Sequence, residues 1–443
     1  MAASLFSRPF FRAYGALWSL ARPLLKRSSR LADGWQERLI PENWLEPDFP
    51  SSDGHAVDVW IQAASGGEAR LAVAVCRHFS ASSSLRILVT TWTRQGRDVL
   101  EQAIPALRQS HPQMTVAVRF APFDHPDTVR RAVSLASPRL VALLETELWP
   151  GLLAACREKN IPVHVFNGRI NSSTAHFGKL FPSLMADISP SAIYAISRYD
   201  KKSFSSMFPC PVDVMHNIKF DLAAGALSEP LARQSHSFST SGPVFLFASV
   251  RQCEETRIPG QLSRIYRAVP NATVIVVPRH LHRVPAWKSV LEDLALMPVL
   301  VSELAQGRSL PRKHVLIWDR FGDLPQLYAS ARAVFVGGSF GQGGQNFLEA
   351  LAAGRVPCIG PSAHNFLWAM GNGDGSMPSL KEAGLLNVAH TPKDVIDIML
   401  RQAASTYDRQ EIRNRFQDWI TPRLGGAAAS ARLIAEAVRT SRS

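Results

Sequence analysis

Short apolar runs alternate with longer segments of helical period along most of the chain. Between residues 57 and 221, each apolar run is followed by a polar or Gly/Pro break and then by a potential helix. The expected strands are Val57–Gln62, Arg86–Thr91, Thr115–Phe120, Leu140–Glu145, Val163–Asn167 and Ala192–Ser197. The alternation predicts a parallel sheet covered by helices on both faces, with functional loops at the carboxyl ends of its strands.

A second series of the same kind follows a stretch from Leu222 to Pro243 that is rich in Ala, Ser, Gly and Pro, which we interpret as a linker. Its expected strands are Val244–Ser249, Thr273–Pro278, His314–Trp318, Ala333–Val336 and Val356–Ile359. We therefore divide the chain into an N-terminal helix (1–35), a first α/β domain (36–222), a linker (223–242) and a second α/β domain with a terminal helix (243–443). Two such domains are expected to face a ligand-binding cleft.

The N-terminal segment carries the membrane signal of the sequence. From Ser4 to Leu25 it is rich in large apolar residues, but Arg8, Arg12 and Arg22 interrupt it. Arginines within the stretch make spanning a bilayer costly, so a helix lying in the interface fits better. The basic residues that follow favour an anionic leaflet, and the alternative is a helix packed on the protein's own surface.

The net charge of +13 points to an anionic partner, which can be a nucleic acid, an anionic membrane surface or a phosphorylated small molecule. The sequence has no RNA-binding aromatic signature and no zinc spacing, so nucleic acid ranks behind the other two and is not expected as a partner. Its five cysteines are scattered without CxxC spacing, which indicates buried thiols in a reducing compartment.

The first site candidate is Ser65-Gly66-Gly67-Glu68, which follows an expected strand. Two glycines permit a tight turn, and a helix is expected to begin near Glu68. A carboxylate there can act as a general base on an acceptor hydroxyl. The alternative is that Glu68 only complements the helix dipole.

Further polar groups stand at other strand or domain ends. Glu145 and Glu147 follow the run Leu140–Leu144 and are placed to bind a polar substrate, with Pro150 suited to an early helical position. Lys219 and Arg279 are the cations that we expect near a phosphate.

The last candidate is a glycine-rich loop that leads into a helix. It contains Gly337-Gly338-Ser339, a second glycine group and Asn346-Phe347-Leu348-Glu349. Such a loop can present backbone amides to a phosphate, and Glu349 can accept hydrogen bonds from a ribose diol. The spacing is not the dinucleotide fingerprint.

Taken in order, these segments resemble the transferases of 3-deoxy-D-manno-octulosonic acid (Kdo), which move this sugar from CMP-Kdo onto a lipid A precursor. The matching stretches are Ala64–Glu68, Leu88–Thr91, Pro122–Asp124, Glu145–Pro150, Asn217–Asp221, Pro278–His280, Gly337–Ser339 and Asn346–Glu349. They span almost the whole chain, and ETELWP and NIKFD are the most specific of them.

The resemblance implies a GT-B fold, in which two facing Rossmann-like domains hold the acceptor (N-terminal) and the nucleotide sugar (C-terminal). It also implies an anchor at the cytoplasmic face of the inner membrane and an inverting reaction that needs no metal or cofactor. Glu68 matches the general base of the family. Lys219, Arg279 and the glycine-loop amides would stabilise the departing CMP, and Glu349 would hold its ribose.

The sequence departs from the family pattern at Gln62 and Gln345, which replace histidines, and at His216, which replaces a glycine. Glutamine keeps hydrogen bonding but cannot titrate near neutral pH, so any charge role of those histidines is absent. Two alternatives remain open: a GT-B transferase that uses another nucleotide sugar, and a catalytically silent paralogue that binds lipid or a partner enzyme.

Overall fold

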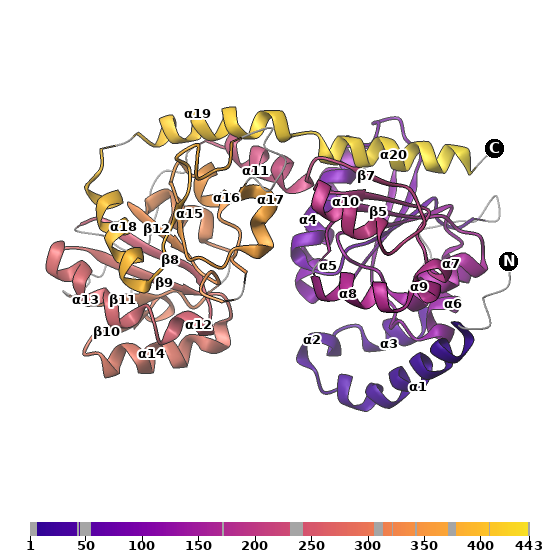
Figure 1. Cartoon of the computed structure of the whole chain (residues 1–443), viewed down its shortest axis with the longest axis horizontal. Coiled ribbons are helices and arrows are strands. Elements are labelled where there is room, and N and C mark those ends of the chain that lie inside the picture. The colour runs from indigo at the N-terminus through magenta and orange to yellow at the C-terminus, as the bar shows by residue number, and fades with distance from the viewer. Residues whose placement is uncertain are drawn as a thin grey trace. The chain divides into compact units, whose positions relative to one another are not determined.

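The structure of the protein is a computed structural model that describes residues 7–41, 44, 55–170, 172–230, 242–304, 313–320, 322–341, 343–370, 378–406 and 408–441. It divides into two units, one of Met1–Leu222 with Leu424–Ser443 and one of Ala223–Arg423. Each unit has its own parallel sheet with helices on both faces (Figure 1).

The first unit is built on a sheet whose described strands run in the order β3-β2-β1-β4-β5-β6-β7, all parallel. The strands are β1 (Val59–Gln62), β2 (Arg86–Thr91), β3 (Thr115–Phe120), β4 (Leu140–Leu144), β5 (Val163–Gly168), β6 (Ala192–Ala195) and β7 (Val212–Val214). Alternate residues of β1 face opposite sides: Trp60 joins one buried apolar cluster, whereas Val59 and Ile61 join the other. Both faces are therefore buried, which explains the continuous apolar runs.

Helices connect these strands and cover the sheet. They are α4 (Gly66–Cys76), α5 (Arg94–Ser110), α6 (Pro126–Ala136), α7 (Pro150–Glu158), α8 (Ser172–Leu180), α9 (Pro182–Asp187), α10 (Arg198–Ser205) and α11 (Ile218–Ser228). Three of them begin at capping residues that follow a strand, namely Ser65, Thr93 and Ser197. Local sequence thus sets where each strand stops and the next helix starts.

The second unit repeats this plan with the strand order β10-β11-β9-β8-β12-β13-β14 among its described residues. Its strands are β8 (Val244–Val250), β9 (Thr273–Pro278), β10 (Met297–Leu300), β11 (His314–Ile317), β12 (Ala333–Val336), β13 (Cys358–Ile359) and β14 (Asn387–Val388). Its helices are α12 (Gln252–Glu255), α13 (Pro259–Ala268), α14 (Val284–Asp293), α15 (Leu324–Ser330), α16 (Leu348–Ala352), α17 (Leu367–Met370), α18 (Pro392–Ala404) and α19 (Arg409–Ile420). The predicted class of two Rossmann-like α/β domains is confirmed.

The terminal helix, predicted as part of the second domain, belongs instead to the first unit. Helix α20 (Gly426–Thr440) packs against α4, and Ala427, Ala431, Ile434 and Val438 lie in the same apolar cluster as β1. Asp221 accepts hydrogen bonds from the N–H groups of Gly425 and Ala427, both 2.7 Å long. The last residue of NIKFD therefore fixes the start of this helix.

The expected linker begins inside a helix, because α11 continues to Ser228 and the boundary between the units falls at residues 222 and 223. Residues 231–241 of the expected linker lie outside the described residues. Strands β7, β10 and β14 were not predicted. These edge strands hold only two to four residues each. Their apolar runs are therefore too short to be recognised in the sequence.

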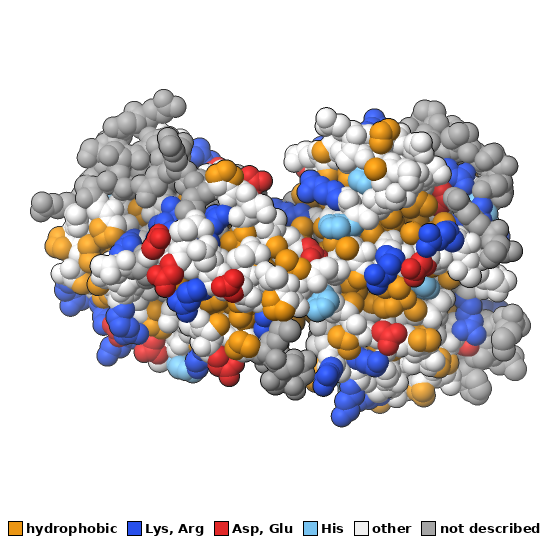
Figure 2. Space-filling model, turned by 90° about the horizontal axis from the view of Figure 1, so that it is seen from above, with side chains coloured by type: hydrophobic (Ala, Val, Ile, Leu, Met, Phe, Trp, Pro, Cys, Tyr) orange, Lys and Arg blue, Asp and Glu red, His pale blue; other side chains and the backbone are white. Residues whose placement is uncertain are grey.

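The N-terminal segment forms α1 (Ser7–Leu25), α2 (Ser29–Ala32) and α3 (Trp35–Leu39), which follow one side of the first unit (Figure 1). Within the described part of the chain, no helix combines the length and the apolar character needed to cross a membrane. On the molecular face in Figure 2, Lys and Arg side chains are spread among Asp and Glu rather than gathered in one patch.

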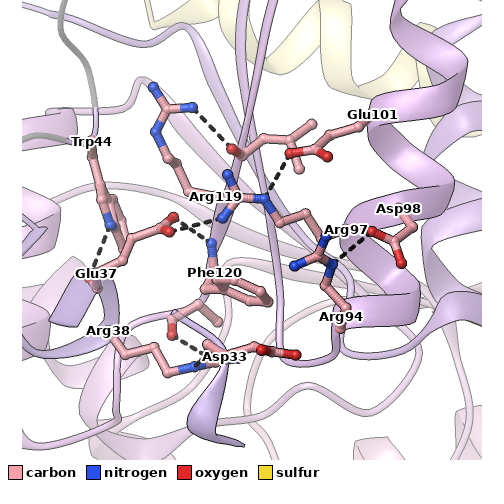
Figure 3. Close-up of polar contacts among 12 residues, drawn as sticks. Asp33, Glu37, Arg38, Trp44, Arg94, Arg97, Asp98, Glu101, Arg119 and Phe120 are labelled. Atoms are coloured by element: carbon pink, nitrogen blue, oxygen red, sulfur yellow. Dashed lines mark hydrogen bonds and ion pairs between the residues drawn. The ribbon is translucent and has the colours of Figure 1, made fainter. Parts of the chain in front are cut away.

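Helix α3 is held to the unit by buried polar contacts (Figure 3). The guanidinium of Arg38, which is fully buried, donates to the carbonyls of Asp33 (3.2 Å), Ala121 (3.2 Å) and Trp92 (2.7 Å). Glu37 accepts a 2.7 Å hydrogen bond from the N–H of Phe120 and forms a 2.9 Å ion pair with Arg97. These contacts anchor the segment that follows α1 to the end of β3.

Candidate active site

The candidate carboxylates of the first unit lie where the strand order of its sheet reverses. Strands β1 and β4 are neighbours, and the chain builds outward from them in opposite directions. Glu68 follows β1, and Glu145 and Glu147 follow β4. Ligands of open α/β sheets bind at such a reversal because the loops after the two strands diverge there. The fold therefore brings together three carboxylates that are up to 79 residues apart in the sequence.

Glu68 lies in the first turn of α4, where the Ser65 hydroxyl accepts from its N–H at 3.5 Å. Its carboxylate accepts a 2.5 Å hydrogen bond from the N–H of Ala64. Burial raises the pKa of Glu68 to about 8, with the negative charges of Glu147 and Glu145 acting in the same direction and the Ala64 N–H opposing them. A carboxylate that only complemented the helix dipole would have a lowered pKa. The raised pKa suits a proton acceptor instead.

Glu145 lies between two cations. It is buried, and its φ of 60° places it in the left-handed region that non-glycine residues seldom adopt. Lys219 forms an ion pair with its Oε1, and the Nε of Arg169 lies 3.8 Å from its Oε2. Lys219, the cation predicted near the donor phosphate, belongs to the first unit and contacts Glu145, and its part in donor binding stays a prediction.

Glu147 is held by neutral donors. The indole Nε1 of Trp149 donates to its Oε2 at 2.7 Å, and the Nε2 of Gln62 lies 3.5 Å from the same oxygen. Burial raises the pKa of Glu147, and the hydrogen bonds of Trp149 and Gln62 oppose that shift. Gln62 also accepts a hydrogen bond from Thr90. The glutamine that replaces a family histidine thus links β1 and β2 to this carboxylate without adding a charge.

In the second unit the strand order reverses between β8 and β12, and a buried carboxylate occupies that place. Glu254 accepts hydrogen bonds from the N–H groups of Arg251 (2.8 Å), Gly338 (2.8 Å) and Ser339 (3.0 Å). The N–H of Gly337 donates to the Ala248 carbonyl. The amides of Gly337, Gly338 and Ser339 are therefore hydrogen-bonded within the second unit.

Gly337 and Gly338 have steric reasons to be glycine. A Cβ on Gly337 would lie 2.6 Å from the Cα of Val250, and Gly338 has a φ of 71°. The Ser339 hydroxyl donates to the Val336 carbonyl and accepts from the Gly360 N–H at 2.7 Å. These residues shape the loop, and their part in donor binding stays a prediction.

The remaining donor-site candidates also lie in the second unit. Arg279 directly follows β9 and is exposed, and its N–H donates to the Val250 carbonyl at 2.8 Å. The Nδ2 of Asn346 donates to the Oε1 of Glu349 at 3.0 Å. Arg279 therefore follows β9, whereas the Asn346–Glu349 pair lies at the start of α16, and their role in holding a nucleotide is likewise a prediction.

Sequence reasoning missed three polar residues near these positions. Asn167 is buried at the end of β5 with a φ of 56°, and its side chain accepts from the Ile218 N–H at 2.8 Å and lies 3.5 Å from Glu145. Arg169 directly follows β5, and Glu254 lies four residues after β8. All three residues lie at or shortly after the end of a strand, so the rule that polar residues at strand ends are functional candidates would have found them.

Comparison with known proteins was made for sequence and for structure. A family model described as 3-deoxy-D-manno-octulosonic-acid transferase (kdotransferase) matches residues 33–222. The 3-deoxy-D-manno-octulosonic acid transferase of Bordetella pertussis is 28% identical over 409 residues, which cover 90% of this chain and 92% of that protein. The enzyme of the same name from Haemophilus influenzae is 28% identical over 70% of this chain and 71% of its own length.

A solved structure supports the fold alone. The UDP-GlcNAc 2-epimerase of Neisseria meningitidis has 13% sequence identity and a TM-score of 0.53, and it covers 86% of this chain and 100% of its own. This places the two units in the GT-B class. The two curated relatives match residues of both units, and the family model matches most of the first unit, so the chain is similar in sequence to 3-deoxy-D-manno-octulosonic acid (Kdo) transferases.

Proposed function

We propose that the protein transfers Kdo from CMP-Kdo to a hydroxyl of a lipid A precursor, with Glu68 as the general base. The observation that carries this proposal is the environment of Glu68: a half-buried carboxylate at the sheet reversal whose pKa is raised to about 8 by burial and by two neighbouring carboxylates. Two similar proteins support the choice of sugar, because their names specify 3-deoxy-D-manno-octulosonic acid transfer.

In the proposed reaction Glu68 accepts the proton of the acceptor hydroxyl as its oxygen bonds to the anomeric carbon of the sugar. The bond between that carbon and the phosphate oxygen breaks, and CMP departs with the electron pair. A base is effective when its pKa lies near the working pH, because its ionised form is then populated and still accepts a proton readily. A pKa near 8 meets this condition better than the ordinary value of 4.5.

The charges of Glu145 and Lys219 shift the pKa of Glu68 in opposite directions. The negative charge of Glu145 favours the protonated form of Glu68, whereas the positive charge of Lys219 favours the ionised form. Because Lys219 is paired with Glu145, the two charges largely compensate each other. We assign Lys219 to this electrostatic role in the acceptor-binding unit.

The donor is assigned to the second unit. Arg279 is exposed at the end of β9 and supplies a planar, permanently charged guanidinium for a phosphate. Glu349, oriented by Asn346, supplies a carboxylate for the ribose hydroxyls. We assign the glycine loop a steric role in donor binding. The amides of Gly338 and Ser339 already donate hydrogen bonds to Glu254.

We place the protein at the cytoplasmic face of the inner membrane through α1. One side of this helix carries Leu17, Leu20 and Leu24, whose exposed fractions are 63%, 76% and 70%, and the exposed Lys26 and Arg27 follow it. Its other side carries Tyr14 and Trp18, which contact Asp124 and Phe123. A helix that docks on its own protein with one face and exposes a leucine stripe on the other fits the membrane interface.

The test is incubation of the full chain with a lipid A precursor and a CMP-Kdo-generating system, followed by mass spectrometry of the lipid. We expect a mass increase of one or more Kdo residues with the wild type, and a loss of at least about 10²-fold in rate with Glu68→Gln. Glu158→Gln is the matched control, because Glu158 is an exposed carboxylate on α7. An unmodified lipid in the wild-type reaction overturns the proposal.

Donor and membrane assignments have separate readouts. Calorimetric titration with CMP and UDP compounds distinguishes CMP-Kdo from another nucleotide sugar, and tighter binding of UDP compounds would contradict the donor assignment. Sedimentation with vesicles that contain anionic phospholipid tests α1. Replacing Leu17, Leu20 and Leu24 by Ser is expected to reduce the bound fraction, since each buried leucine contributes about 1.5–3 kcal/mol.

A further inference from the structure

Pro122-Phe123-Asp124 matches the family but has no part in the proposed reaction. Asp124 lies four residues after the end of β3 and is buried. Its two carboxylate oxygens accept hydrogen bonds from the N–H groups of Gly151 and Leu152, both 2.8 Å long. The hydroxyl of Tyr14, on helix α1, donates to the same carboxylate at 2.8 Å. Asp124 therefore joins α1 to the first turn of α7.

The first turn of α7 directly follows the loop that holds the site carboxylates. Helix α7 begins at Pro150, one residue after Trp149, whose indole donates to Glu147. The approach of Asp124 is close enough that a Cβ on Gly151 would lie 2.7 Å from the Asp124 carbonyl oxygen. Since the amides at a helix start have no partner within the helix, a carboxylate that binds two of them fixes where the helix begins.

An aromatic path runs parallel to this polar one. Phe123 contacts Trp18 of α1 and Trp92, with ring centroids 5.8 Å and 6.1 Å apart. Trp92 in turn packs on Trp149, with centroids 5.0 Å apart. The two adjacent residues Phe123 and Asp124 thus connect α1 with Trp149 and α7 through separate contacts.

We propose that Asp124 is a positioning residue that transmits the docking of α1 to Glu147, so that the catalytic loop 145–149 is ordered only when α1 lies on the unit. The proposal deepens, and for its kinetic consequence rests on, the Kdo transfer proposed above. The leucine stripe of α1 faces away from the contacts of Tyr14 and Trp18. A membrane that binds the leucines therefore leaves these contacts in place, so the loop stays ordered in the membrane-bound protein.

Two variants of graded severity test this role, and neither alters a site carboxylate. Tyr14→Phe removes one hydrogen bond to Asp124 and keeps the ring. Asp124→Asn keeps the shape but sets an NH₂ group against one of the two α7 amides, which leaves that amide unsatisfied. Tyr199→Phe is the matched control, because Tyr199 lies in the first unit with an exposed fraction of 65%.

The first readout is hydrogen exchange of the full chain bound to vesicles that contain anionic phospholipid. We expect peptides that cover 145–153 to exchange about tenfold faster in Asp124→Asn and about threefold faster in Tyr14→Phe, with no change in Tyr199→Phe. Vesicle binding should be equal in all four proteins. Unchanged exchange at 145–153 in Asp124→Asn overturns the proposal, whether or not the protein transfers Kdo.

The second readout is steady-state transfer from CMP-Kdo. We expect kcat to fall about tenfold in Tyr14→Phe while KM for the donor is unchanged, because the donor residues belong to the other unit. A general loss of folding would instead lower the fraction of active enzyme. It would also appear as a loss of cooperative unfolding. A fall in donor affinity, or equal kcat in Tyr14→Phe and wild type, contradicts the positioning role.

Discussion

The proposed base gives the activity a pH dependence that can be moved in either direction by substitution. With a pKa of about 8, about one tenth of Glu68 is ionised at pH 7 and about nine tenths at pH 9. If ionised Glu68 accepts the proton, kcat/KM should therefore rise about tenfold between these values, with its midpoint near pH 8. An ordinary carboxyl with a pKa of 4.5 would give a flat profile over this range.

Two neighbours shift the midpoint in opposite directions. Burial is the main cause of the raised pKa, and the charge of Glu147 is the next. Glu147→Gln removes that charge, so the midpoint should fall by about 0.5–1 pH unit. Lys219→Gln removes the cation that favours ionised Glu68, so the midpoint should rise, and by less, because Lys219 is the smallest of the contributions. Lys201→Gln, at a partly exposed lysine of the same unit that pairs with Asp213, is the control.

The assay is the initial rate of transfer at low acceptor concentration from pH 6 to 10, with enzyme integrity checked at each pH. It also decides between two places for Lys219. If Lys219 binds the donor phosphate, Lys219→Gln should raise KM for CMP-Kdo and leave the midpoint unchanged. Profiles of wild type, Glu147→Gln and Lys219→Gln that share one midpoint would refute the electrostatic account of Glu68.

Three further predictions concern stability. Because the pKa of Glu68 is raised in the folded state, its stabilising contribution is present below pH 4.5 and is lost as the pH rises through about 8. Denaturant titration should therefore find Glu68→Gln more stable than wild type at pH 9, by on the order of 2 kcal/mol, and no such gain at pH 4. Asp58 is fully buried between two arginines at 3.2 and 3.3 Å, so Asp58→Asn should destabilise the first unit by about 3 kcal/mol in urea unfolding, and an unchanged midpoint would contradict this. Gly337→Ala should lower the thermal midpoint of the second unit, whereas Gly260→Ala, in helix α13 with no atom within 4 Å of the new Cβ, should leave it equal or raise it by up to about 1 kcal/mol in stability.

Local sequence determined the strands, the helix starts and the residue that we propose as base. Strands β2, β3, β9 and β12 have the predicted bounds, because most of their residues are buried and each strand is therefore a mainly apolar run. Helix α4 begins at Gly66, two residues before the start expected near Glu68, because the Ser65 hydroxyl caps it. Glu68 was identified for the same reason: its position relative to the end of β1 is a property of adjacent residues.

The tertiary structure decided which of these residues meet, because contacts between distant segments leave no local pattern. Lys219 lies 74 residues after Glu145, and only the neighbouring positions of β4, β5 and α11 bring the two together. Glu254 bonds to the amides of Gly338 and Ser339, so a loop that suggests a phosphate site already holds a carboxylate. Charge and polarity can be read from a sequence, but whether a buried amide or cation is already paired depends on what the fold places opposite it.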